Sequence, residues 1–143
     1  MSSTPKSEDF ELGLKMMAEV LGDQAPVRTM EICNDFNRKA YETAIEYGFG
    51  RIWGDKALTK KQHSLNNLCL LAALNRPREF RIHFKGALRN GCSKAELSAT
   101  ISQIMAYAGF PAGVEAMHIA EEVIAAWEAK GRPIAPDAEL TTD

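Results

Sequence analysis

Several features that mark common classes of protein are missing from this sequence of 143 residues. No window approaches the roughly 20 consecutive apolar residues of a membrane-spanning helix. The first ten residues, MSSTPKSEDF, contain no apolar run, so we expect no signal peptide. Lys and Arg total 17 against 19 Asp and Glu, a net charge of −2. This near-balance argues against nucleic acid or an anionic membrane as partner. We expect a cytoplasmic protein with neither.

Cysteine is scarce, and the spacing of the cysteines does not match a metal-binding motif. The three cysteines, Cys33, Cys69 and Cys92, lie far apart and form no CxxC pair. An odd number of isolated thiols fits a reducing cytoplasm and argues against a zinc knuckle or a dithiol redox centre. The sequence also lacks a phosphate-binding glycine loop, GxSxG and HExxH. No metal site is therefore expected.

Helical patterns, by contrast, fill most of the chain. Hydrophobic residues make up 45% of it, enough for one sizeable core. The periodicity predicts an all-α protein of about six helices with no convincing strand. The expected helices cover residues 9–21, 26–47, 59–75, 77–90, 93–108 and 111–130. We expect a flexible N-terminus at 1–8, a single helical domain at 9–130 and a tail at 131–143.

Local signals set several of the expected helix ends. Gly48-Phe49-Gly50 is expected to break the second helix. The stretches Thr59–Gln62 and Ser93–Glu96 have the pattern of capping boxes, in which side chains satisfy the free backbone donors of a helix start. The run LCLLAAL at 68–74 is apolar all round, which predicts a central helix surrounded by others. Asn90-Gly91 suits a left-handed helix end.

The helix that begins at Pro77 raises the main functional question. With Pro77 at the first helical position, Phe80 and Ala87 mark the centre of an apolar face. Glu79 and His83, four residues apart, are expected in the middle of that same face. They form either a structural ion pair at a helix interface or an acid–base pair with tuned pKa values. Periodicity alone does not choose between these two interpretations.

Five further residues are candidates for substrate contacts, each with a structural alternative. Arg76 lies at the positive end of the new helix, where it either binds a carboxylate or is simply exposed in a turn. His63 and Ser64 lead into the apolar run and form either a polar end of a pocket or capping and subunit contacts. Trp53 and Tyr107 are amphipathic rings that pack in cores and interfaces by default, but that also suit a binding site.

The order of motifs resembles that of a known family. The segments IWGDKAL, HSLNNLCLLAALNRPREFRIHFKGALRNGCSKAEL and YAGFPAGVEAMHIAEEV are similar to the carboxymuconolactone decarboxylase family, over roughly residues 11–127. This family belongs to the alkylhydroperoxidase D-like superfamily. The resemblance implies a small all-α fold that oligomerises, as a trimer or hexamer, and that needs no metal or organic cofactor. It also implies a small-molecule lactone or carboxylate as substrate.

The resemblance also separates two branches of chemistry. The alkylhydroperoxidase D-like branch carries CxxCxxxH, and setting its histidine on His83 places its two cysteines on Arg76 and Glu79. Its upstream Glu falls on Ser64. Without these thiols, disulfide-based peroxidase chemistry lacks its nucleophile. The decarboxylase branch typically has Arg, Glu and His at the three places, as this chain does, so the resemblance favours an active site.

The chain departs from the decarboxylase pattern just before this stretch. The decarboxylases usually have RPGL where this chain has DKAL at 55–58, and Arg-Ser-Leu where it has His63-Ser64-Leu65. We interpret the two missing arginines as carboxylate ligands. Either the substrate has fewer carboxylates, or Arg51, Lys60 and Lys61 compensate.

The expected function is decarboxylation of a γ-carboxymuconolactone-type unsaturated lactone in aromatic catabolism, as in the β-ketoadipate pathway. His83 is the expected general acid, Glu79 orients it and tunes its pKa, and Arg76, helped by His63, anchors a carboxylate or carbonyl oxygen. Two alternatives stay open. One is an isomerase, ring-opening or cyclising enzyme that uses the same pair, and the other is a non-catalytic oligomeric scaffold.

Overall fold

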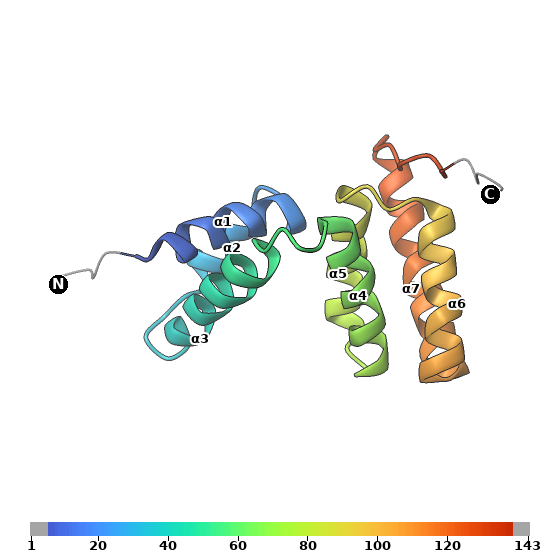
Figure 1. Cartoon of the computed structure of the whole chain (residues 1–143), viewed down its shortest axis with the longest axis horizontal. Coiled ribbons are helices and arrows are strands. Elements are labelled where there is room, and N and C mark those ends of the chain that lie inside the picture. Colours follow the sequence, from blue (N-terminus) through green and yellow to red (C-terminus); the bar gives the residue numbers. More distant parts are fainter. Residues whose placement is uncertain (1–5, 139–143) are drawn as a thin grey trace. The chain divides into compact units, whose positions relative to one another are not determined.

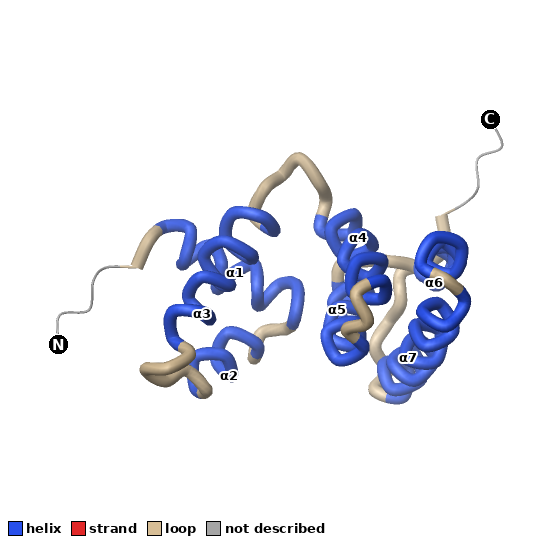
Figure 2. The backbone as a smooth tube through the Cα atoms, turned by 90° about the horizontal axis from the view of Figure 1, so that it is seen from below, coloured by secondary structure: helices blue, strands red, loops and turns tan. Residues whose placement is uncertain are grey.

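The computed structural model describes residues 6–138, and within that range the chain forms seven α-helices, one π-helical segment and no strand (Figures 1 and 2). This confirms the predicted all-α class. The chain divides into two compact units, one ending at Lys60 and the other beginning at Lys61. The single helical domain expected at 9–130 stays a prediction. None of the described helices is long and apolar enough to cross a membrane.

The first unit is built on α1, Glu8–Leu21, packed against the π-helical segment η1, Ala44–Trp53. The Ser7 hydroxyl accepts a hydrogen bond from the Phe10 amide at 3.1 Å and so caps α1. Residues 1–5 of the predicted flexible N-terminus lie outside the described residues. The apolar faces of α1 and η1 form the core of this unit, which contains Phe10, Met16, Met17, Val20, Ile45 and Trp53.

The helix expected over 26–47 is interrupted. The structure has α2 at Ala25–Glu31 and α3 at Arg38–Thr43, with irregular backbone between them. Asn34 and Asn37 explain the interruption: the Asn37 carboxamide accepts from the Asn34 amide at 2.8 Å and donates to the Ile32 carbonyl at 3.0 Å. Such side-chain bonds compete with the helical backbone pattern. The single long helix was therefore a wrong prediction.

The break expected at Gly48-Phe49-Gly50 was also wrong, because η1 runs through both glycines. Gly50 instead lies directly against the backbone of α1. A Cβ atom at Gly50 would stand 2.1 Å from the carbonyl oxygen of Asp9, whereas one at Gly48 would meet nothing within 4 Å. Gly50 therefore permits the close approach of two helices rather than ending one.

We expect Gly50→Ala to destabilise the protein by about 1–3 kcal/mol, because the added methyl group forces the α1 and η1 backbones apart. Gly48→Ala is the matched control, and it should leave stability unchanged or raise it by up to about 1 kcal/mol. Urea unfolding followed by circular dichroism measures both. Equal effects of the two substitutions would show that the approach of α1 to η1 is not the reason for the glycine.

The second unit contains four helices that run alongside one another, α4 at Lys60–Ala73, α5 at Pro77–Arg89, α6 at Lys94–Ala108 and α7 at Phe110–Ala129 (Figure 1). Both α5 and α6 pack on α7. The core of this unit includes Leu68, Phe80, Phe84, Leu97, Ile104, Val123 and Trp127.

The apolar run on α4 is not enclosed within the second unit. Leu68 is buried, but Leu70 and Leu74 are 58% and 65% exposed. The prediction of a central helix surrounded on all sides is therefore not met by the helices of this unit. One face of α4 packs inward, and α5, α6 and α7 do not cover the opposite face, which is also apolar.

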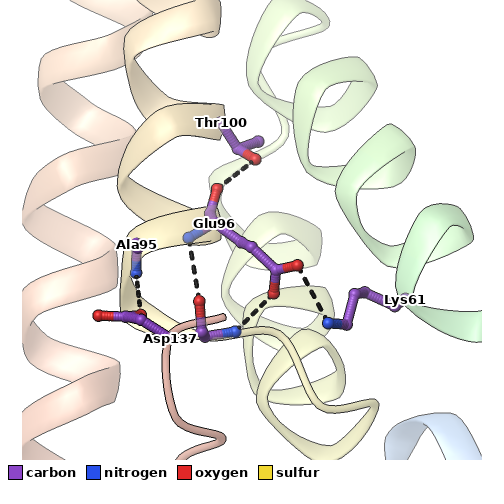
Figure 3. Close-up of polar contacts among 6 residues, drawn as sticks. Lys61, Ala95, Glu96, Thr100 and Asp137 are labelled. Carbon is purple, nitrogen blue, oxygen red and sulfur yellow. Dashed lines mark hydrogen bonds and ion pairs between the residues drawn. The ribbon is translucent and has the colours of Figure 1, made fainter. Parts of the chain in front are cut away.

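Helix ends in the second unit follow the sequence signals closely. Ser93 and Glu96 form the predicted capping box, and Gly109, with φ +100°, separates α6 from α7. The described part of the predicted tail, residues 131–138, is held against these helices. Trp127 Nε1 donates to the Pro133 carbonyl at 3.0 Å, and Asp137 accepts from the Ala95 amide at 2.9 Å (Figure 3).

Candidate active site

Two buried phenylalanines determine how helix α5 is oriented about its own axis. It begins with Pro77 at the first helical position, as predicted, and its inward face contains Phe80 and Phe84, whose rings lie 5.9 Å apart. Both rings are almost completely buried in the core of the second unit. Because the burial of large aromatic rings stabilises a helix more than its surface contacts do, these two side chains decide which way the rest of α5 points.

Glu79 and His83 consequently lie at the edge of the apolar face. The prediction that they occupy its centre was wrong, because Phe80 and Phe84 take that place. Glu79 is exposed, whereas His83 is half-buried and its Nδ1 atom is buried. Burial lowers the pKa of His83 below its ordinary value of 6.5, and the negative charge of Glu79 raises it in part. The imidazole is therefore mainly neutral at pH 7.

A hydrogen bond shows which helix His83 faces. Asn90 Nδ2 donates to Ser64 Oγ at 2.9 Å, which joins the end of α5 to the second turn of α4. His83 stands seven residues before Asn90, two turns earlier on the same side of the helix, so it too is turned toward α4. On α4, His63 is half-buried with a buried Nε2 atom. The α4–α5 interface therefore contains the Ser64–Asn90 hydrogen bond, with His83 on the same side of α5 as Asn90.

Arg76 lies at the other end of α5, just before the first turn. Its side chain is exposed, and within the described residues no acidic side chain lies at ion-pair distance from it. Arg76 lines a hollow of about 10 Å³, enough for roughly one water molecule, and Asn75 and Glu115 of α7 also line it. Glu79 and His83 do not line this hollow. Of Arg76, Glu79 and His83, Arg76 is therefore the one that lines this hollow.

Two further candidate residues belong to other elements than α4 and α5. Trp53 belongs to the first unit, where it is buried among Met16 and Val20 and stacks on Phe49 with ring centroids 6.4 Å apart. Tyr107 is 85% exposed in the last turn of α6. Neither ring therefore belongs to α4 or α5, the helices that contain His63, Ser64 and His83.

Sequence reasoning missed Asn90 and Glu115. Asn90 was noticed only as part of a helix-end signal, although its spacing of seven residues from His83 places both on one side of α5. Glu115 gave no signal, because its approach to Arg76 depends on how α7 packs against α4 and α5.

The thiols near this interface are not poised for redox chemistry. Burial raises the pKa of Cys69, and burial with the charge of Glu96 raises the pKa of Cys92 to about 11, against the opposing effect of Lys61. Both thiols are protonated at neutral pH, and a thiol reacts far more slowly than a thiolate. Within residues 6–138 no group of three or more metal-ligating side chains is placed to hold a metal ion.

The fold and this interface define an all-helical protein with a carboxylate and a partly buried imidazole one turn apart on a single helix. The Carboxymuconolactone decarboxylase family matches residues 38–122. A 4-carboxymuconolactone decarboxylase of Acinetobacter baylyi is 37% identical over 114 residues, 80% of this chain and 85% of the relative. A nitrosuccinic acid decarboxylase of Metarhizium robertsii is 29% identical over 115 residues, 80% of each chain. The chain belongs to the carboxymuconolactone decarboxylase family, and it is a carboxy-lyase of that family.

We expect the His83 ring to titrate with a midpoint below 6.5, because burial disfavours its charged form. In Glu79→Gln the midpoint should fall further, since the carboxylate that favours the imidazolium is gone. NMR titration of the ring carbons measures this, and three histidines in the chain keep the spectrum simple. Glu128→Gln, which removes an exposed carboxylate paired with Lys94, is the control and should leave the midpoint unchanged. A wild-type midpoint at or above 6.5 would contradict the burial of His83.

Proposed function

We propose that the protein decarboxylates a γ-carboxymuconolactone-type unsaturated lactone, with His83 and Glu79 as its acid–base pair. The observation that carries this proposal is the partly desolvated imidazole of His83 one turn from a solvated carboxylate, in a family of decarboxylases. The 37% identity to a 4-carboxymuconolactone decarboxylase supports the substrate class. A place in aromatic-compound catabolism, in the β-ketoadipate pathway, follows from that substrate and stays a prediction.

The reaction needs an electron sink and a proton. In such a lactone the bond from the ring carbon to its carboxylate breaks, and its electron pair moves through the ring double bond to the lactone carbonyl oxygen. Carbon dioxide leaves, and the dienolate takes up one proton at the ring carbon next to the carbonyl group. An apolar surrounding assists the first step, because a carboxylate loses its hydration there.

His83 supplies the proton in this proposal, and its lowered pKa fits that task. The imidazole is mainly neutral in the free protein, since burial disfavours its charged form more than Glu79 favours it. A carboxylate of the bound substrate adds a second negative charge and raises the pKa of His83 in the complex. Substrate binding thus places a proton on His83, which passes it to carbon and is recharged from water. Glu79 orients the ring.

Arg76 binds a substrate carboxylate or the developing enolate oxygen. Its guanidinium is exposed at the start of α5, where the helix dipole also favours an anion. Because the adjoining hollow has room for about one water molecule, the substrate reaches Arg76 from outside rather than within the unit. His63 is a further proposed contact, and the substrate contacts expected at Trp53 and Tyr107 stay predictions.

A nitro acid is the second candidate substrate. The 29% identical relative is a nitrosuccinic acid decarboxylase, and nitrosuccinate also has an electron sink next to the departing carboxylate, in its nitro group. The same proton donor would serve, since the resulting nitronate is likewise protonated at carbon.

Assembly into a homo-oligomer, a trimer or hexamer, belongs to this proposal as well. The second unit exposes Leu70, Leu74, Tyr107 and Phe110, large apolar side chains that a monomer would gain stability by covering.

We expect the purified protein to release carbon dioxide from 4-carboxymuconolactone, and more slowly or not at all from nitrosuccinate, as followed by ultraviolet absorbance and a coupled assay for carbon dioxide. His83→Gln should lower kcat by about 10²–10⁴-fold, the usual contribution of a positioned acid. Arg76→Gln should act mainly on KM. The exposed His118, replaced in the same way, is the control.

Three outcomes would revise the proposal. Turnover of nitrosuccinate alone would make the nitro acid the substrate. Conversion of a lactone without carbon dioxide would indicate an isomerase or ring-opening enzyme. Near-wild-type turnover by His83→Gln would remove His83 from the chemistry.

A further inference from the structure

The second turn of α4 holds a hydroxyl group that solvent does not reach. Ser64 is 1% exposed, and its Oγ accepts the hydrogen bond from Asn90 Nδ2 at 2.9 Å. A buried hydroxyl costs stability unless it is bonded, and an alanine would have filled the same place without that requirement. The Ser64–Asn90 bond therefore has a role beyond filling space.

That bond is directional, whereas the packing around it is not. Phe80, Phe84 and Leu68 fill the core between α4, α5 and α7, and such apolar contacts tolerate small rotations and shifts of a helix. A hydrogen bond between side chains of α4 and α5 permits one rotation and one register only. Since Asn90 lies two turns after His83 on the same side of α5, about 10 Å along the axis, fixing Asn90 fixes the direction of His83.

A second polar contact holds the same part of α4. Lys61 Nζ donates to Glu96 Oε1 at 3.0 Å, and Glu96 is itself fixed in the capping box of α6 (Figure 3). The start of α4 is thus tied to α6 through Lys61 and to α5 through Ser64. His63, whose Nε2 atom is buried, stands between these two anchors in the sequence.

We propose that Ser64 and Asn90 are positioning residues: their hydrogen bond sets the rotation and register of α5 against α4, and so holds His83 and His63 in their places at the interface. Ser64 does not touch the substrate, since its oxygen is buried and already bonded. This proposal rests on the function proposed above, in which His83 donates the proton. It assigns a role to Asn90, and it replaces the predicted substrate contact of Ser64.

The test compares Ser64→Ala, Asn90→Ala and the double variant, which all remove the same bond. Ser102→Ala is the matched control, because Ser102 is exposed and its hydroxyl donates to the Ser98 carbonyl of its own helix at 3.1 Å. Circular dichroism checks that each variant is folded. If Ser64→Ala does not fold, Asn90→Ala removes the same hydrogen bond by changing its half-buried partner. The readouts are kcat and KM on 4-carboxymuconolactone and nitrosuccinate, and the ring-carbon NMR signals of the three histidines.

The expected result is a drop in kcat of about tenfold in each single variant, because a small displacement of a catalytic group is costly, with KM changed less than about twofold. The double variant should lose no more than either single one, since only one bond is removed. The NMR signals of His83 and His63 should move in all three variants and that of His118 should not. Ser102→Ala should change nothing.

Several results would overturn the proposal. An increase in KM at constant kcat in Ser64→Ala would mean that Ser64 contacts the substrate after all. Additive losses in the double variant would mean that the two residues act separately. If the wild type turns over neither compound, the proposed function fails, and the NMR comparison then decides the positioning role alone: unchanged His83 and His63 signals would refute it.

Discussion

Burial of Phe80 and Phe84 is the constraint on which the candidate site depends. The two rings fix how α5 is turned, and every other side chain of that helix takes its surroundings from this rotation. Glu79 is left in solvent and His83 is left half-buried against α4, so one of two neighbouring ionisable groups is desolvated and the other is not. The difference in environment, rather than the residue types alone, makes the pair suited to moving a proton.

Desolvation also explains why a decarboxylase would use this arrangement. Burial holds the His83 pKa down, so the charged ring is disfavoured until a second negative charge arrives beside that of Glu79. A substrate carboxylate brings that charge, and the same apolar surroundings that lower the His83 pKa favour loss of the carboxylate as neutral carbon dioxide. Arg76 stands just before the first turn of α5, so in the proposed reaction it binds the substrate and does not transfer the proton.

Short sequence patterns predicted local structure well. They failed where contacts between segments distant in the sequence determine the structure. Pro77, the capping box at Ser93 and the all-α class follow from short patterns and were confirmed. The interruption after α2 depends on side-chain bonds between Asn34 and Asn37 that compete with a helix of adequate propensity. The role of Gly50 depends on a contact between two helices, and so does the hydrogen bond between Ser64 and Asn90. The periodicity of a single helix carries no information about such contacts. For the same reason, the periodicity of α5 wrongly predicted that Glu79 and His83 lie at the centre of its apolar face, where the structure has Phe80 and Phe84.

Delivery of the proton by a fixed group can be observed in the product. Decarboxylation in deuterium oxide introduces one deuterium at the carbon that is protonated, and this carbon becomes a CHD centre in the products of both 4-carboxymuconolactone and nitrosuccinate. If His83 donates the proton from its place on α5, the label enters from one face and the product has a single configuration at that carbon, as NMR of a chiral derivative would show. Release of carbon dioxide with a racemic label would mean that water protonates a released intermediate, and His83 would then have no part in the step.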